Sequence, residues 1–216
     1  MLEKMDAFFE ARLEGYDQHM LSNIESAQEF YPFTASLLPQ TANANILDLG
    51  CGTGLELEYY LPGNSTAQIT GIDLTAAMLN ALQRKFHQHK ITTIHGSYFD
   101  VPFGTEVYDA AVSVESLHHF TQAEKRPLYQ KLYHSLKKDG FFILTDYFAD
   151  TDMQEHSFRN ELLRLKQENG INDQEFYHYD TPLTVSHETE ALLQAGFACV
   201  EIMGCWGPTR TLKATK

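Results

Sequence analysis

Apolar positions recur along the chain in two alternating rhythms. Short apolar runs at 44–49, 67–74 and 108–116 have the length of buried strands. Between them, as at 76–86, apolar residues return every three or four positions, which is the spacing of one helix face. Strand and helix alternate about five times before residue 150, and this predicts a parallel sheet covered by helices on both faces.

Capping and breaking residues mark the ends of several elements. Thr75 precedes a helical stripe and can cap it, and Thr121 with Glu124 has the spacing of a capping box that opens a helix ending near residue 136. In the N-terminal segment, the apolar residues from Phe8 to Ile24 recur at helical steps. Pro32 is expected to interrupt that helical pattern.

The rhythm changes after residue 150. The polar segment that follows contains one helix and a tyrosine-rich loop, and it is expected to lie over the sheet as an insertion. The last two strands are so close in sequence that they must form an antiparallel hairpin. The sequence predicts one Rossmann-like, doubly wound α/β domain (1–216) with a seven-stranded sheet, mostly parallel with an antiparallel C-terminal strand. Its parts are a helical lid (1–40), a core (41–149), the insertion (150–182), and a C-terminal helix and β-hairpin (183–216).

Composition and charge narrow the range of partners. Hydrophobic residues make up 43% of the chain, and no apolar run approaches the roughly 18 residues of a membrane span. The N-terminus lacks the apolar region of a signal peptide, and the three cysteines have no CxxC spacing, as suits reduced thiols. A formal charge of −13 opposes binding to DNA or RNA. We expect a cytoplasmic protein, a monomer or homodimer, with a small-molecule partner and neither nucleic acid nor membrane.

The stretch from Ile46 to Gly54 reads ILDLGCGTG and follows the first predicted strand. Glycines there let a ligand approach the backbone, and the next helix offers free amide groups at its N-terminus. In a doubly wound sheet this is where ligands bind, beyond the carboxyl end of the strand at which strand order reverses. The spacing is GxGxG with Leu55 next, which differs from the GxGxxG of dinucleotide-binding loops.

These residues resemble the class I S-adenosylmethionine-dependent methyltransferases of the small-molecule type. In that family an acidic-x-Gly-x-Gly-x-Gly loop holds the methionine part of the cofactor, and an acidic residue that ends the second strand takes the ribose hydroxyls. Asp73 stands at that second position. The resemblance implies S-adenosylmethionine as cofactor and methyl transfer to a small molecule, with 41–149 as the cofactor-binding core and 150–182 over the active site. The residues it implies at the cofactor are Asp48, Gly50, Cys51, Gly52, Gly54, Asp73, Leu74, Met78, Ser97, Tyr98, Phe99, Val114, Glu115, Tyr16 and Arg12.

Candidate catalytic residues end the fourth strand. A sulfonium methyl group needs placement of the acceptor more than it needs acid or base chemistry. His119 is the candidate base for a hydroxyl or amine acceptor, and Glu115 can contact cofactor or substrate. His87 and His89 alternate at a helix end, but no carboxylate or thiolate pattern completes a ligand set, so we expect no metal site. Four aromatic residues either wall an acceptor pocket or pack in the core: Phe176, Tyr177, Tyr179 and Trp206.

Two other functions stay open from the sequence. One is a regulatory protein that binds S-adenosylmethionine without turnover. The other is an enzyme that uses the same cofactor for a non-methylating reaction. An arginine near the sulfonium would favour the second, and Arg12 is the candidate for it.

Overall fold

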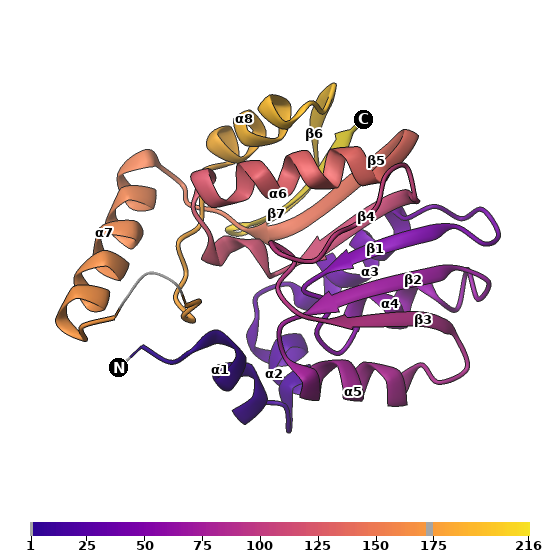
Figure 1. Cartoon of the computed structure of the whole chain (residues 1–216), viewed down its shortest axis with the longest axis horizontal. Coiled ribbons are helices and arrows are strands. Elements are labelled where there is room, and N and C mark those ends of the chain that lie inside the picture. Colours follow the sequence, from indigo (N-terminus) through magenta and orange to yellow (C-terminus); the bar gives the residue numbers. More distant parts are fainter. Residues whose placement is uncertain (1, 172–174) are drawn as a thin grey trace.

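A seven-stranded sheet crosses the molecule and separates two layers of helices (Figure 1). The computed structural model describes residues 2–171 and 175–216; residues 1 and 172–174, in the predicted lid and insertion, lie outside the described part. The strands are β1 (Asn45–Leu49), β2 (Gln68–Asp73), β3 (Lys90–His95), β4 (Tyr108–Val114), β5 (Leu136–Tyr147), β6 (Cys199–Trp206) and β7 (Thr209–Thr215). The helices are α1 (Met5–Ala11), α2 (Tyr16–Asn23), α3 (Ala27–Leu37), α4 (Leu55–Tyr60), α5 (Ala76–Lys85), η1 (Leu117–His119), α6 (Gln122–Ser135), α7 (Asp152–Glu168) and α8 (Val185–Ala195).

Strand order explains where a ligand can bind. The order is β3-β2-β1-β4-β5-β7-β6, with β1 to β5 parallel and β7 antiparallel to both β5 and β6. The chain runs outward from β1 to β3 and then crosses to β4 on the other side of β1. The order therefore reverses between β1 and β4, and the loops after these two strands diverge to leave a crevice at their carboxyl ends. The predicted doubly wound sheet with its C-terminal hairpin is confirmed.

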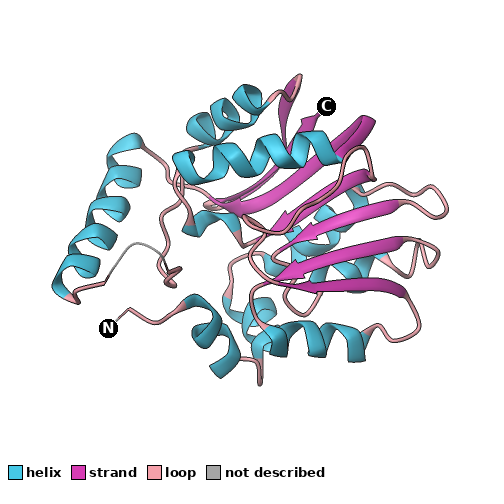
Figure 2. Cartoon of the chain, in the orientation of Figure 1, coloured by secondary structure: helices cyan, strands magenta, loops and turns pink. Residues whose placement is uncertain are grey.

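Helices cover both faces of the sheet (Figure 2). Alternation along the strands divides the core into two halves, one on each face. Leu47 and Leu49 of β1 pack with α6 and α8, whereas Ile46 packs with α3, α4 and α5. Successive side chains of a strand point to opposite faces, so a continuous apolar strand serves both halves. α6 and α8 are also joined by a buried ion pair, Lys125 Nζ to Glu188 Oε2, at 2.5 Å.

Local sequence signals had mixed outcomes. The capping box of Thr121 and Glu124 is present at the start of α6. Thr75 occupies the N-cap of α5 without a side-chain cap; its backbone N–H donates instead to Asp73 Oδ1 at 2.7 Å. The expectation that Pro32 interrupts the helical pattern was wrong, because it lies inside α3. This helix is buried against the sheet, and its packing outweighs the local cost of a proline.

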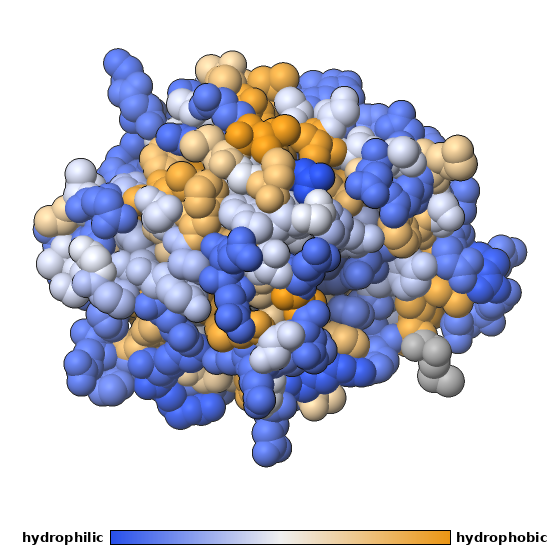
Figure 3. Space-filling model, turned by 180° about the vertical axis from the view of Figure 1, so that it is seen from behind, coloured by the Kyte–Doolittle hydropathy of each residue, from blue (hydrophilic) through white to orange (hydrophobic). Residues whose placement is uncertain are grey.

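The surface is mostly hydrophilic when the molecule is seen from behind, with apolar atoms gathered near its upper edge (Figure 3). Among the described residues, no helix is both long enough and apolar enough to span a membrane. The outer strand β6 exposes Ile202 and Met203. α7 buries none of its side chains and stands apart from the sheet (Figure 1).

Two carboxyl groups are buried side by side at the end of β1. Asp48 of β1 and Glu56 of α4 are 1% and 4% exposed. One carboxyl oxygen of each, Asp48 Oδ2 and Glu56 Oε1, has no hydrogen-bond partner among the described residues. Burial, and secondarily the charge of Glu56, raises the pKa of Asp48 well above its usual value, and burial raises the pKa of Glu56. A raised pKa in the folded state means that the native protein holds a proton that the unfolded chain releases.

Asp48→Asn should therefore stabilise the protein increasingly as pH rises. The wild-type protein loses stability as pH rises from about 4 towards the raised pKa of Asp48, because the unfolded chain then binds fewer protons than the native state. Asparagine carries no charge and can donate to Glu56. Between pH 5 and pH 8 we expect the variant's advantage in free energy of unfolding to grow by about 1.4 kcal/mol or more, measured by urea denaturation. A difference in free energy of unfolding between variant and wild type that stays constant from pH 5 to pH 8 would contradict this prediction. Asp100→Asn, at an exposed aspartate, is the matched control.

Candidate active site

The glycine loop turns sharply between β1 and α4. Gly50, Gly52 and Gly54 have positive φ angles of 71°, 49° and 75°, which side chains with a Cβ rarely adopt. The backbone N–H of Gly50 donates to the Ile72 carbonyl at 2.8 Å and so joins the loop to β2. A Cβ on Gly52 would come no nearer to another side chain than 4.0 Å, at the ring of Tyr16. At Gly52 the loop therefore presents bare main chain beside open space.

Asp73 ties this loop to the next one. Its Oδ2 accepts the backbone N–H of Gly52 at 2.9 Å, and its Oδ1 accepts that of Thr75 at 2.7 Å. Burial raises the pKa of Asp73, although the two amide hydrogen bonds counteract this. Each carboxylate oxygen has a further lone pair that can receive a ligand hydroxyl.

A cavity of about 60 Å³ lies in front of the glycine loop. Predicted cofactor residues come together here from the ends of β1, β2, β3 and β4 and from α2. Those that line the cavity are Tyr16, Gly50, Gly52, Asp73, Leu74, Met78, Ser97, Tyr98, Phe99, Val114 and Glu115.

Four residues predicted at the cofactor lie elsewhere. Asp48 is buried beneath the loop, and Cys51 fills space, with its Sγ 2.8 Å from where a Cβ of Gly71 would be. Gly54 is the N-cap of α4. Arg12 lines a second cavity; its guanidinium pairs with Glu3 at 3.0 Å and lies over the ring of Phe8.

Sequence reasoning did not assign several lining residues. Met5 and Phe9 belong to α1, and Ser116 and Phe120 flank η1. Phe9 belongs to a helical apolar stripe, which indicates burial without saying against what.

A second, larger cavity of about 800 Å³ adjoins the first. Phe9, Tyr16, Glu115 and His119 line both cavities, so these residues form the junction. The wall of the larger cavity away from the junction combines apolar and aromatic side chains with ionisable ones. It includes Phe8, Met20, Ile24, His118, Tyr147, His178, Asp180 and Thr209.

Glu115 has an unusual conformation at this junction. Its φ is +49°, in the left-handed region that costs a non-glycine residue free energy and that is enriched at functional sites. Thr209 Oγ1 donates to its Oε1 at 3.4 Å. Burial, together with the negative charge of Asp146, raises the pKa of Glu115 to about 8.

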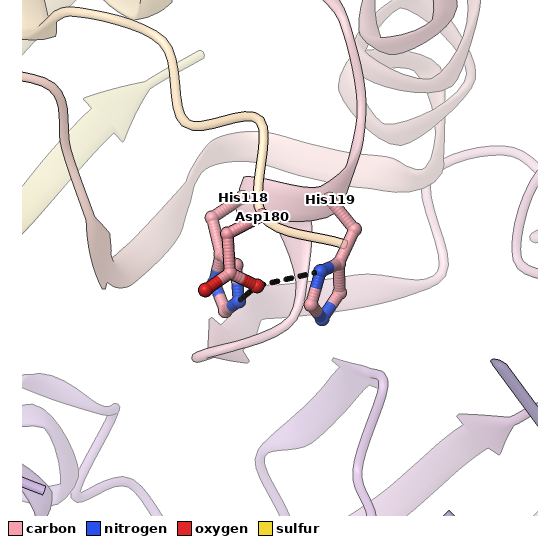
Figure 4. Close-up of side chains that lie close together, drawn as sticks. All are labelled: His118, His119 and Asp180. Carbon is pink, nitrogen blue, oxygen red and sulfur yellow. Dashed lines mark ion pairs between the residues drawn. The ribbon is translucent and has the colours of Figure 1, made fainter. Parts of the chain in front are cut away.

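The paired histidines of η1 face acidic residues from two directions. Nδ1 of His118 donates to the buried Asp146 at the end of β5, at 2.5 Å. Asp180 Oδ1 lies 3.5 Å from Nε2 of His118 and 3.3 Å from Nδ1 of His119 (Figure 4). The charges of Asp146 and Asp180 raise the pKa of His118 despite its burial, whereas burial and the neighbouring His118 lower the pKa of His119 to about 4. Neither aspartate was identified from the sequence, although Asp146 ends a predicted strand.

Two segments remote in sequence pair above the cavities. Backbone N–H groups of Met5 and His178 donate to Phe176 and Glu3, each at 3.0 Å, and the rings of Phe8 and His178 stack at 3.5 Å. At the other end of this cover, α2 is fixed by Asp17, which accepts hydrogen bonds from Thr53 of the glycine loop and from Lys85 of α5.

The four uncertain aromatic residues separate into different roles. Phe176 lines the smaller cavity. Trp206 packs against Phe33 with ring centroids 5.1 Å apart, and the Tyr177 hydroxyl donates to Glu175 at the surface. Tyr179 lines neither of the two joined cavities, and its carbonyl lies 3.3 Å from Nδ1 of His119.

Comparison with known proteins agrees with this geometry. Residues 46–140 match the methyltransferase domain family. The chain is 28% identical to the carboxy-S-adenosyl-L-methionine synthase of Wolinella succinogenes, over 96% of this chain and 92% of that protein. It is 26% identical to the fatty-acid O-methyltransferase of Mycolicibacterium smegmatis, over 59% of this chain and 46% of that one.

A solved structure shares the fold. Human N-acetylserotonin methyltransferase in complex with S-adenosylmethionine superposes with a TM-score of 0.69 at 17% identity, over 99% of this chain and 59% of that one. The chain thus spans less than two thirds of that protein and of the fatty-acid enzyme, but nearly all of the synthase. Sheet order, glycine loop, strand-end aspartate and these matches support a class I S-adenosylmethionine-dependent methyltransferase.

Proposed function

We propose that this enzyme transfers the methyl group of S-adenosylmethionine to a small molecule held in the larger cavity. The observation that carries the proposal is the junction of the two cavities at Phe9, Tyr16, Glu115 and His119. A donor in the smaller cavity and an acceptor in the larger one would meet there. Placement of this kind can provide much of the rate acceleration of a methyl transfer.

The smaller cavity has the chemistry that the cofactor requires. The carboxylate of Asp73 can accept the ribose hydroxyls while it keeps its bonds to two loop amides. Bare main chain at Gly52 can take the amino-acid end, and the rings of Tyr98 and Phe99 can contact the adenine. S-adenosylmethionine, when bound, supplies an activated methyl group on a positively charged sulfur.

The lining of the larger cavity indicates the class of acceptor. Phe8, Met20 and Tyr147 offer apolar surface, whereas Glu14, Glu25 and Asp180 are acidic. Acidic groups in an enclosed site disfavour an anion. We therefore expect a neutral acceptor with an apolar body and a reacting hydroxyl or amine, and His119 at the junction to orient that group or accept its proton.

A non-methylating reaction is the second candidate, because a relative aligned over 96% of the chain is named a carboxy-S-adenosyl-L-methionine synthase. Binding a carboxylate beside the sulfonium calls for a free cation. Among the described residues that line the two cavities, Arg12 is the only arginine, and Glu3 already neutralises it. Methyl transfer is therefore favoured. An acceptor cavity joined to the cofactor cavity also favours turnover over a purely regulatory role.

Cytoplasmic location, the absence of nucleic-acid and membrane partners, and a monomeric or dimeric state stay predictions. The free state of the three cysteines supports a cytoplasmic location. The net charge of −13 supports the absence of a nucleic-acid partner.

Asp73→Ala should weaken binding of S-adenosylhomocysteine about 10- to 100-fold, because two hydrogen bonds to a charged group are lost together with the loop's anchor. Isothermal titration calorimetry measures the change, and exposed Asp100→Ala is the control. Undetectable binding to the wild-type protein at high micromolar concentration would refute the cofactor assignment, and an unaltered affinity of Asp73→Ala would place the sugar elsewhere.

The reaction products should separate the two enzymatic candidates. Incubation with methyl-labelled S-adenosylmethionine and a panel of neutral apolar hydroxyl and amine compounds should give S-adenosylhomocysteine and a labelled acceptor, detected by mass spectrometry. An enlarged sulfonium nucleoside that retains the label on sulfur, without S-adenosylhomocysteine, would instead establish the non-methylating reaction.

A further inference from the structure

Three potential metal ligands converge on the wall of the larger cavity (Figure 4). They are one ring nitrogen each of His118 and His119 and a carboxylate oxygen of Asp180, and these atoms all lie within 4.8 Å of one another. Both histidines belong to η1, whereas Asp180 arrives from the segment that follows α7. Asp180 is held in place because the N–H of Thr181 donates to the His118 carbonyl at 2.8 Å.

The spacing of the three atoms is that of ligands around one ion. Asp180 Oδ1 is 3.5 Å from His118 Nε2 and 3.3 Å from His119 Nδ1. Neighbouring ligands of a tetrahedral zinc ion with bonds of about 2.05 Å stand about 3.3 Å apart. These contacts are longer than a strong ion-pair hydrogen bond, such as the 2.5 Å between His118 and Asp146.

A buried carboxylate orients the first of these ligands. A carboxylate ion only accepts hydrogen bonds, so the ring hydrogen of His118 that Asp146 receives is on Nδ1, and Nε2 points to the cluster. Asp146 is itself fixed by the backbone N–H groups of Leu117, at 2.8 Å, and Tyr147, at 2.9 Å. Metal-binding histidines commonly donate their second ring nitrogen to a carboxylate in this way.

We propose that His118, His119 and Asp180 bind a divalent transition-metal ion, with Zn²⁺ the best match to two imidazoles and one carboxylate. This replaces the sequence-based expectation of no metal site. The three residues all line the larger cavity, so the remaining coordination positions face the acceptor. The inference rests on the proposed function for its role: an ion there would bind the acceptor's hydroxyl oxygen, lower the pKa of that hydroxyl, and hold it at the junction beside His119.

A proton is the competing occupant of this cluster. With a proton on Nε2 of His118, Asp180 would bridge the two rings as an ion pair that only fastens its segment to η1. The carbonyl of Tyr179, 3.3 Å from Nδ1 of His119, would then receive the hydrogen of that nitrogen. Metal binding distinguishes the two arrangements without any measurement of activity.

The test is calorimetric titration of zinc chloride into the full-length protein after a chelator has removed bound metal. We expect one ion per chain, with affinity weakened at least about tenfold in Asp180→Asn and His119→Ala, and about 10- to 100-fold in Asp146→Asn. His178→Ala is the matched control, because its ring centroid lies 5.0 Å from that of His119 but it is outside the ligand group. Its zinc affinity should be unchanged.

Two further measurements keep the test decisive. Co²⁺ in place of zinc should give visible absorption bands that Asp180→Asn loses, and circular dichroism checks that each variant is folded. Each preparation is also titrated with S-adenosylhomocysteine. A wild-type protein that binds S-adenosylhomocysteine but no stoichiometric zinc, or zinc binding insensitive to Asp180→Asn and His119→Ala, would overturn the metal site and leave the proposed function intact. Failure to bind S-adenosylhomocysteine would instead count against the proposed function.

Discussion

One carboxylate joins the two loops on which the smaller cavity depends. Asp73 ends β2 and accepts backbone N–H groups from Gly52, in the loop after β1, and from Thr75, at the start of α5. Without it, two amides at the crevice would need water, and the glycine loop would lose its tie to the neighbouring strand end. A buried carboxylate is costly unless it is hydrogen-bonded, and these two amides offset that cost. The same residue therefore shapes the cavity and leaves lone pairs directed at a ligand.

The cover over the cavities is assembled differently from the crevice. Its parts are α1 and α2, near the N-terminus, and residues 175–181, which precede α8, and neither part belongs to the sheet. They are held by backbone pairing between Glu3–Met5 and residues 176–178, by the stacked rings of Phe8 and His178, and by Asp17 at the glycine loop. Exposed contacts of this kind contribute less stability than the core does, so this cover is the part best suited to open for exchange of ligands.

Features set by short stretches of sequence could be predicted, whereas groups of side chains that only the fold brings together could not. Continuous apolar strands, the GxGxG loop and the capping box at Thr121 are short-range patterns, and each has one physical interpretation. The prediction that Pro32 interrupts the helical pattern was wrong, because the packing of α3 outweighed the low helix preference of proline. The cluster of His118, His119 and Asp180 could not be predicted from sequence spacing. The two histidines are adjacent, but Asp180 lies about 60 residues further along the chain and meets them because Thr181 pairs with the backbone of η1.

Parallel topology explains why so many ionisable groups meet at one edge. β1, β2, β4 and β5 all finish there, and each is followed by or ends in a functional candidate: the glycine loop, Asp73, Glu115 with the histidines, and Asp146. β7 runs the opposite way, so that its first residue, Thr209, is at this edge and reaches Glu115. A parallel strand at that position would place its last residue, and not its first, at this edge of the sheet. The reversed last strand thus completes the wall of the larger cavity, and the direction of one strand bears on the chemistry of the site.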